Sequence, residues 1–175
     1  MIKMEKIAVY MGSFNPPHLG HIKVMDRMLE LHDKIHVFVR YNEGVDLADA
    51  ETKKGWFDTL SAERDGRVIV HIFRTDDMKG KTYTGNIFGH FLKYFEELLG
   101  SKIDEVWCGE DAAQLIEECR EKFPETNFVI NQRYTGECYN STAIRNDLEG
   151  HKTWVPEYVY ESLVQAAIDR EQGSV

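Results

Sequence analysis

Short apolar runs alternate with longer amphipathic segments along most of this chain. The apolar runs predict five β-strands, over residues 7–11, 34–40, 68–73, 103–108 and 127–130. The segments between and after them repeat apolar residues at the three-to-four-residue spacing of an α-helix. This spacing predicts helices over residues 19–31, 51–62, 87–99, 112–122, 142–148 and 157–169.

Strands and helices that alternate in this way form parallel sheets with helices packed on both faces. The pattern therefore predicts an α/β fold: a single Rossmann-like, doubly wound domain over residues 1–175, with a five-stranded, mostly parallel sheet. Sheets of this kind bind ligands just outside the carboxyl ends of their strands, so functional residues are expected in the segments that follow the strands.

The segment directly after the first predicted strand carries the strongest functional signal. Residues 12–21 read Gly-Ser-Phe-Asn-Pro-Pro-His-Leu-Gly-His and lead into a helix that begins near His18. Free backbone N–H groups at a helix N-terminus suit phosphate. His18 and His21 share one face of the first turn, and Gly20 would let a ligand approach the backbone closely. Two donors beside a phosphate site are what in-line transfer at phosphorus requires.

A second constellation lies at residues 139–145, which read Tyr-Asn-Ser-Thr-Ala-Ile-Arg. Asn140 or Ser141 can cap a helix that begins near Thr142. The N–H groups of that helix, the two hydroxyls and the permanently charged guanidinium of Arg145 would form a second anion site. Two anion sites in one domain could hold the reacting phosphate and the leaving phosphates of one substrate.

Composition narrows the class of protein. The net charge of −9 over 175 residues disfavours nucleic acid as a partner. The three cysteines, an odd number without Cys-x-x-Cys spacing, indicate reduced thiols and a cytoplasmic location. No apolar run approaches the length of a signal peptide or a transmembrane helix, so no membrane contact is expected. The oligomeric state stays open, and a homo-oligomer is compatible with this composition.

Together the two constellations carry a resemblance to a known superfamily. His18-Leu19-Gly20-His21 and Ser141-Thr142-Ala143-Ile144-Arg145 resemble the His/Thr-x-Gly-His and Ser/Thr-x-x-Arg motifs of the nucleotidylyltransferases. Within that superfamily the chain is most similar to nicotinamide-mononucleotide adenylyltransferases of the archaeal type and of the bacterial bifunctional NAD-biosynthesis regulators. The likeness extends from residue 7 to about residue 163.

The resemblance implies adenylyl transfer from ATP to nicotinamide mononucleotide, which gives NAD and pyrophosphate. Mg²⁺ is the implied cofactor, held mainly by phosphate oxygens and water, so no metal-ligating residues are expected. The implied catalytic residues are His18 and His21, on the α- and β-phosphates, and Arg145, on the β- and γ-phosphates. The final helical segment, from about residue 142 to residue 170, would close the ATP site.

The resemblance also implies a wider set of ATP-binding residues. Besides the three catalytic residues, this set comprises Gly12, Ser13, Phe14, Gly20, Gly109, Asp111, Ser141 and Thr142. Gly109 and Asp111 would lie near the ribose of ATP, and the two hydroxyls near its β- and γ-phosphates.

The acceptor is expected near the irregular segment after the third strand. Asp76 and Asp77 there would tolerate the pyridinium cation and repel the extra carboxylate of nicotinate mononucleotide. Phe88 stands where archaeal relatives place a tryptophan, so the resemblance implies that it stacks on nicotinamide. Nicotinamide mononucleotide is therefore the expected acceptor.

Other interpretations stay open. The acceptor could be nicotinate mononucleotide, phosphopantetheine or another phosphate, and the donor could be CTP. Class I aminoacyl-tRNA synthetases share the first motif, but they need a lysine-rich loop of which residues 78–81 are a poor version. His18 and His21 without a third ligand are a weak zinc signal. A non-catalytic nucleotide sensor would not need both histidines and Arg145.

Overall fold

All five strands of the structure run parallel in one sheet. The computed structural model describes residues 5–81, 85–131 and 139–173. Its strands are β1 (Ala8–Gly12), β2 (Ile35–Arg40), β3 (Val68–Phe73), β4 (Glu105–Gly109) and β5 (Asn127–Asn131). They lie in the order β3-β2-β1-β4-β5. The Rossmann-like prediction is confirmed, with a sheet that is entirely rather than mostly parallel.

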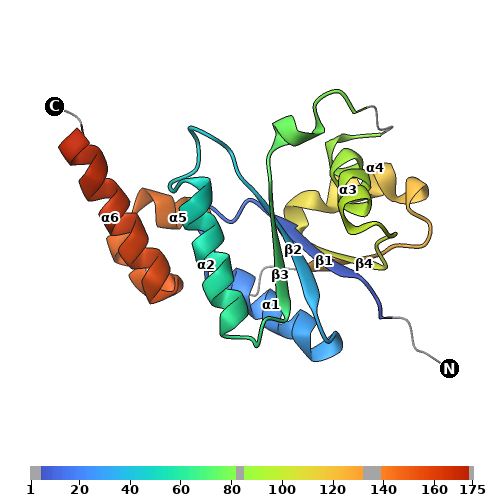
Figure 1. Cartoon of the computed structure of the whole chain (residues 1–175), viewed down its shortest axis with the longest axis horizontal. Coiled ribbons are helices and arrows are strands. Elements are labelled where there is room, and N and C mark those ends of the chain that lie inside the picture. Colours follow the sequence, from blue (N-terminus) through green and yellow to red (C-terminus); the bar gives the residue numbers. More distant parts are fainter. Residues whose placement is uncertain (1–4, 82–84, 132–138, 174–175) are drawn as a thin grey trace.

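Helices cover both faces of this sheet (Figure 1). On one face lie α1 (Leu19–Leu31) and α2 (Ala50–Ala62). The short α5 (Ser141–Asn146) and α6 (Glu157–Gly173) extend the apolar cluster of this side past the carboxyl ends of the strands. On the other face lie α3 (Ile87–Leu99) and α4 (Ala113–Cys119). Each face buries its own apolar cluster against the sheet, because successive side chains of a strand point to opposite faces. In β1, for example, Tyr10 packs in the first cluster and Val9 in the second.

Several helix boundaries differ from the predicted ones. In place of the predicted helix 112–122 the structure has the shorter α4. A 3-10 helix lies on each side of it, η2 (Glu110–Ala112) before and η3 (Arg120–Lys122) after. The helix predicted over 142–148 ends at Asn146, because Asp147 Oδ1 accepts the N–H of Gly150 at 3.0 Å and so favours a turn over a further helical residue. A third 3-10 helix, η1 (Thr75–Met78), lies in the segment predicted to be irregular, and a fourth, η4 (Glu149–Trp154), follows α5.

Two further expectations concern thiols and membranes. Cys108 and Cys119 are buried free thiols, and Cys138 lies outside the described residues. None of the helices within residues 5–81, 85–131 and 139–173 combines the length and apolar composition that crossing a membrane requires.

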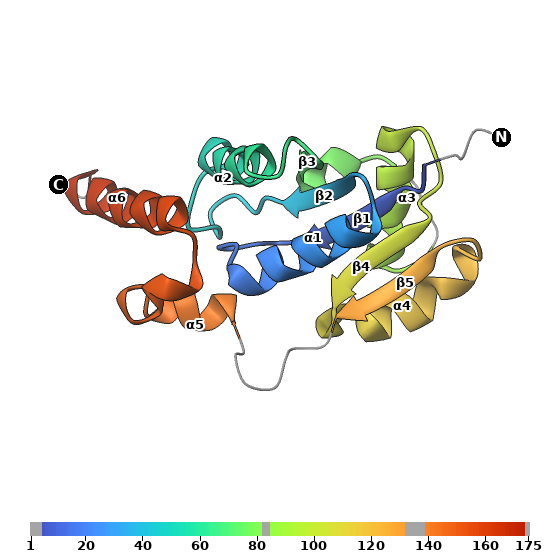
Figure 2. The same ribbon diagram turned by 90° about the horizontal axis from the view of Figure 1, so that it is seen from below.

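The strand order reverses between β1 and β4, and this reversal positions the site. The chain leaves β1 through α1 towards β2 on one side, whereas β4 leads through α4 to β5 on the other. The segments that follow β1 and β4 therefore diverge at the carboxyl edge of the sheet, where such folds bind ligands. The start of α5 lies near the start of α1 in the second view (Figure 2), and Ser141 Oγ donates to Pro16 O at 3.1 Å.

Candidate active site

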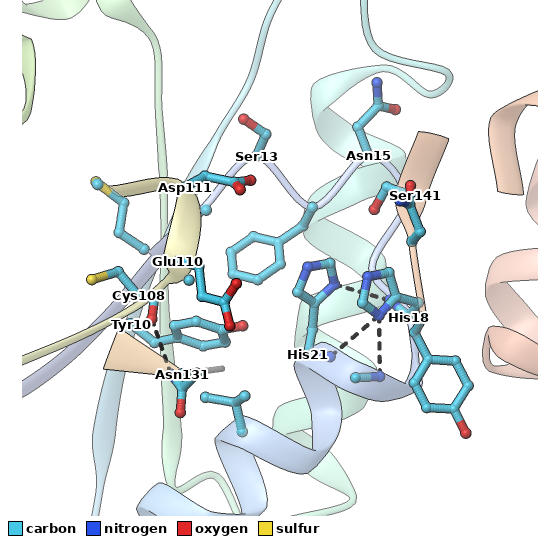
Figure 3. Close-up of a pocket in the computed structure, with 18 of the residues that line it drawn as sticks. Tyr10, Ser13, Asn15, His18, His21, Cys108, Glu110, Asp111, Asn131 and Ser141 are labelled. Atoms are coloured by element: carbon cyan, nitrogen blue, oxygen red, sulfur yellow. Dashed lines mark hydrogen bonds between the residues drawn. The ribbon is translucent and has the colours of Figure 1, made fainter. Parts of the chain in front are cut away.

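A cavity of about 700 Å³ lies at the carboxyl ends of β1 and β4 (Figure 3). Four segments form its walls: the turn after β1, the first turns of α1, the turn after β4, and the start of α5. All the residues predicted to bind ATP line it: Gly12, Ser13, Phe14, His18, Gly20, His21, Gly109, Asp111, Ser141, Thr142 and Arg145. Of the segment 142–170, only the first helix, α5, contributes to the lining.

The three residues predicted to bind the acceptor are not among the lining residues. Phe88 is 2% exposed and packs in the apolar cluster between α3, α4 and the sheet, so the ring face that stacking needs is covered. Asp77 Oδ2 accepts the N–H of Arg74 at 2.8 Å and caps η1. Asp76 is exposed on the same short helix. An apolar residue at a helical spacing packs as readily into the core as against a ligand, and here the core takes Phe88.

His18 and His21 hold each other at the start of α1. His18 is the N-cap residue, and its Nδ1 accepts the N–H groups of Gly20 at 3.1 Å and of His21 at 3.4 Å. In return, His21 Nδ1 accepts the N–H of His18 at 3.1 Å. A ring nitrogen that accepts a hydrogen bond carries no proton, so each neutral imidazole carries its proton on Nε2. Both rings line the cavity, so each contributes one possible hydrogen-bond donor to it, the N–H of Nε2.

This arrangement corrects the predicted use of the helix N-terminus. The N–H groups of Gly20 and His21 were expected to be free for phosphate, but they donate to His18 Nδ1. The close approach expected at Gly20 is made by the same ring, because a Cβ there would lie 2.9 Å from His18 Cε1. Imidazole donors therefore replace backbone donors at this end of the cavity.

The electrostatics favour a neutral ring at His21. Burial lowers the pKa of His21 well below its ordinary value, and the neighbouring His18 and the cationic Lys53 lower it further. Phe14 packs edge-on against His21, with 4.7 Å between ring centroids, and shields one side of it from water. At neutral pH, His21 is therefore an uncharged hydrogen-bond donor.

The second predicted motif is joined directly to the first. Arg145 donates to Asn15 O at 2.7 Å and to Thr142 Oγ1 at 3.0 Å. The hydroxyl of Ser141 donates to Pro16 O. Two of the five guanidinium N–H groups of Arg145 are thus used for this junction, and three remain to contact an anion.

The N-terminus of α5 is capped by a side chain. Asn140 Oδ1 accepts the N–H groups of Thr142 and Ala143, at 2.8 and 3.2 Å. The anion site predicted here therefore depends on the guanidinium of Arg145 more than on backbone N–H groups.

The wall after β4 is acidic. Glu110 and Asp111, in η2, both line the cavity, as does Asn131 at the end of β5. Asn131 Nδ2 donates to Cys108 O at 3.2 Å and so joins the ends of the two strands. Carboxylate oxygens accept hydrogen bonds, which suits the hydroxyl groups of a ribose.

Sequence reasoning assigned no ligand-binding role to several lining residues: Tyr10, Met11, Asn15, Lys23, Val24, Cys108, Glu110, Ala112, Asn131, Tyr139 and Asn140. Some of them carried a usable signal. Lys23 and Val24 lie three and four residues after Gly20, one helical turn further along the same face. Asn131 directly follows the predicted strand 127–130, but its place beside Cys108 depends on the parallel pairing of β4 with β5.

The cavity is poor in metal ligands. Within the described parts of the chain, no three His, Cys, Asp or Glu side chains lie close enough together to hold a metal ion. Mg²⁺ prefers six oxygen ligands, and among the described lining residues only Glu110 and Asp111 supply carboxylates.

Comparison with known proteins identifies the family of the chain. A cytidylyltransferase-like family profile matches residues 9–147, which include both motifs and all of the sheet except Ala8. The chain belongs to the cytidylyltransferase-like family. This result confirms the predicted membership of the nucleotidylyltransferase superfamily.

Individual relatives within this family differ in the acceptor that their names give. A "probable nicotinate-nucleotide adenylyltransferase" of Pseudothermotoga lettingae is 26% identical over 169 residues, which are 91% of this chain and 77% of the relative. A phosphopantetheine adenylyltransferase of Mycoplasma capricolum is 49% identical over 37 residues, which are 21% of this chain and 26% of the relative. The chain thus aligns with only about a quarter of the second relative.

A solved structure shares the fold of the chain. It is a bifunctional NMN adenylyltransferase/ADP-ribose pyrophosphatase of Francisella tularensis, complexed with AMP and a manganese ion. The TM-score is 0.61 at 14% identity, and the match covers 93% of this chain and 49% of the other. At this identity the similarity establishes the fold alone.

Proposed function

We propose that this protein transfers the adenylyl group of ATP to the phosphate of a pyridine mononucleotide and releases pyrophosphate. The observation that carries the proposal is the reciprocal hydrogen bonding of His18 and His21. It fixes two neutral Nε2–H donors in a cavity that Arg145 also lines. Such an arrangement can stabilise charge that develops on phosphate oxygens during transfer.

The reaction needs little covalent chemistry from the protein. A phosphate oxygen of the acceptor attacks the α-phosphorus of ATP, and the bond from that phosphorus to the bridging oxygen of the β-phosphate breaks. The bonding electrons leave with pyrophosphate. Because the attacking phosphate is already an anion, no side chain has to remove a proton. His18 and His21 would donate to the α- and β-phosphates, and the guanidinium of Arg145 to the β- and γ-phosphates.

Mg²⁺ is part of the proposal as an ion that ATP carries. The sparse carboxylates of the cavity fit an ion whose ligands come mainly from phosphate and water. When bound, the ion would neutralise part of the triphosphate charge. Glu110 and Asp111 would then accept hydrogen bonds from ribose hydroxyls, with Gly109 before them leaving room for the sugar.

The class of acceptor is supported by one relative that spans most of the chain. The Pseudothermotoga lettingae relative, whose name gives a nicotinate nucleotide, covers 91% of this chain. Besides the family resemblance, the physical argument for nicotinamide over nicotinate depended on Asp76, Asp77 and Phe88, none of which lines the cavity. We therefore propose a pyridine mononucleotide and leave the choice between amide and carboxylate to experiment.

Phosphopantetheine is the second candidate acceptor. It is favoured by the 49% identity to the Mycoplasma capricolum relative, although that match spans only 21% of this chain. The nucleotide donor and the transfer chemistry would be the same with either acceptor.

A pyrophosphate-release assay tests the proposal. ATP and CTP are each combined with nicotinamide mononucleotide, nicotinate mononucleotide or phosphopantetheine. We expect pyrophosphate and a dinucleotide only with ATP and a pyridine mononucleotide. Turnover with phosphopantetheine alone would select the second candidate. ATP binding without pyrophosphate release from any pair would refute the transferase proposal and indicate a nucleotide sensor.

A further inference from the structure

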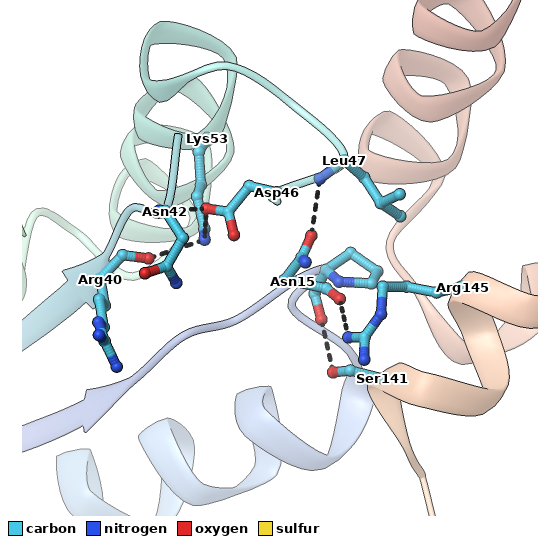
Figure 4. A network of polar contacts seen from close by, with 9 residues as sticks. Asn15, Arg40, Asn42, Asp46, Leu47, Lys53, Ser141 and Arg145 are labelled. Carbon is cyan, nitrogen blue, oxygen red and sulfur yellow. Dashed lines mark hydrogen bonds and ion pairs between the residues drawn. The ribbon is translucent and has the colours of Figure 1, made fainter. Parts of the chain in front are cut away.

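A buried ion pair lies behind the turn that carries the two histidines. Lys53 Nζ, from the first turns of α2, is 2.7 Å from Asp46 Oδ2 in the loop 41–49 between β2 and α2 (Figure 4). The side chains of Lys53 and Asp46 are 1% and 2% exposed. Lys53 Nζ also donates to Arg40 O at 2.9 Å, and Asp46 Oδ2 accepts the N–H of Asn42 at 3.1 Å. The pair therefore connects the end of β2 at Arg40 with Asn42 and Asp46, and it fixes the path of the loop over residues 41–46.

The same loop holds the turn after β1. Leu47, the residue after Asp46, donates its backbone N–H to Asn15 Oδ1 at 2.9 Å. The main-chain oxygen of Asn15 accepts from Arg145 at 2.7 Å. Asn15 thus lies between the loop fixed by the ion pair and the helix that carries the second motif, as Figure 4 shows.

Aromatic packing gives a second connection between α2 and the histidines. Phe57 lies one turn after Lys53, and both are buried on the same face of α2. Phe57 packs edge-on against Phe14 with 5.1 Å between ring centroids, and Phe14 packs in the same way against His21 at 4.7 Å.

Stability alone does not explain this pair. A buried ion pair is often no more stabilising than apolar residues of similar size, because two charges must leave water. Asp46 Oδ1 is also buried without a hydrogen-bond partner among the described residues, which adds to the cost.

We propose that Lys53 and Asp46 form a positioning pair for the transfer site, which holds the loop 41–49 and through it the turn that presents His18 and His21. The inference rests on the proposed adenylyl transfer. Neither residue lines the cavity, so the pair acts through the turn and not by touching phosphate.

The charge of Lys53 has a separate effect on His21. The groups near His21 are His18 on its own helix, Lys53 on α2, and the carboxylates of Glu110 and Asp111 across the same cavity. The cation lowers the pKa of His21, after burial and His18. It thereby helps to keep Nδ1 unprotonated, and only then can Nδ1 accept the His18 N–H.

The test uses one charge-removing variant, one compensated variant and a matched control. Lys53→Met removes the cation, and Lys53→Met with Asp46→Leu replaces the pair by apolar residues. Lys54→Met is the control, since Lys54 is the next residue, exposed, and paired with Asp58 on the surface. We expect Lys53→Met to lower kcat roughly 10- to 100-fold, with a much smaller change in KM for ATP, as for a small displacement of a catalytic group.

Two readouts separate positioning from simple destabilisation. In the double variant the thermal midpoint should return towards that of the wild type while kcat stays low. In NMR titrations of the free protein, His21 should titrate at higher pH in both Lys53 variants than in the wild type or Lys54→Met. Recovery of kcat together with stability, or an unchanged His21 titration, would overturn the inference. A wild-type protein without turnover would refute the proposed function instead, and the titration would still test the pair.

Discussion

The imidazole rings of His18 and His21 stack with 3.7 Å between their centroids and 17° between their planes. Each ring accepts a backbone N–H from the other residue through Nδ1. Two donors with the same tautomer are therefore held at a fixed separation, close enough to contact oxygens of one phosphate or of two adjacent phosphates. Loss of either ring should disturb the position of the other, so these two residues are the first to mutate.

The variant His21→Ala tests the donor role. We expect kcat to fall by roughly 10²–10³, the typical effect of removing one preorganised donor, while ATP binding weakens much less. Steady-state kinetics with ATP and calorimetric binding of an unreactive ATP analogue measure the two effects. His151→Ala is the control, because His151 lies in η4 outside the cavity. A near wild-type kcat in His21→Ala would remove His21 from the mechanism.

Arg145 joins the two motifs and faces the cavity, so its variants should affect ATP more than the acceptor. Arg145→Lys keeps the charge but cannot reach both Asn15 O and Thr142 Oγ1 while contacting phosphate. We expect both Arg145→Lys and Arg145→Ala to raise KM for ATP, the second more strongly. Equal increases in KM for ATP and for the acceptor would indicate a role in folding only.

Gly20 lies under the ring of His18. In Gly20→Ala the new Cβ would lie 2.9 Å from His18 Cε1 and 3.3 Å from Tyr139 Cβ, so the ring must move. We expect kcat to fall by roughly tenfold or more, as for a small displacement of a catalytic group. Gly55→Ala is the matched control, because it is also helical and a Cβ there meets nothing within 4 Å. Equal activity of the two variants would show that the His18 ring position is unimportant.

A variant of Phe88 tests the predicted acceptor contact of this residue. Because its ring is buried between α3 and the sheet, Phe88→Leu should lower the free energy of unfolding by about 1 kcal/mol. We expect the ratio of kcat/KM for the nicotinamide and nicotinate mononucleotides to stay unchanged. Chemical denaturation and paired kinetics provide the measurements. A changed ratio would return Phe88 to the acceptor site.

His36 should make the stability of the protein depend on pH. Its Nδ1 lies 3.1 Å from His71 Nε2 on the neighbouring strand, and burial, followed by the effect of His71, lowers the pKa of His36 to about 4. In the unfolded chain the pKa of His36 has its ordinary value of 6.5. Between about pH 4 and pH 6.5 the unfolded chain therefore binds more protons than the folded protein. Stability should therefore fall as the pH falls from about 6.5 to about 4.

The variant His36→Gln isolates this contribution. Its free energy of unfolding, measured by denaturant titration at pH 7 and pH 5, should decrease less than that of the wild type over the same interval. Parallel decreases in the two proteins would show that other groups cause the acid sensitivity.

The spacing of His18, His21 and Arg145 was sufficient to predict that these residues line one cavity, because helix periodicity and motif content are local. The tautomers of the two rings were not predictable, since they depend on which backbone N–H each ring nitrogen accepts. The burial of Phe88 was not predictable for a related reason: the same helical spacing suits a core face and a ligand face. Asn15 and Lys53 act through the loop 41–49, whose path follows from tertiary contacts rather than from any local pattern.

The two walls of the cavity rest on different halves of the apolar core. The wall with His18 and His21 is backed by Phe14 and the cluster under α1 and α2, whereas Ala112 and Cys108 belong to the cluster under α3 and α4. Mutations that repack one half therefore act mainly on one wall. Sequence change under α3 and α4 can alter the wall after β4 while the geometry of His18 and His21 is preserved. This fold can thus acquire new substrates during evolution without having to rebuild its reaction centre.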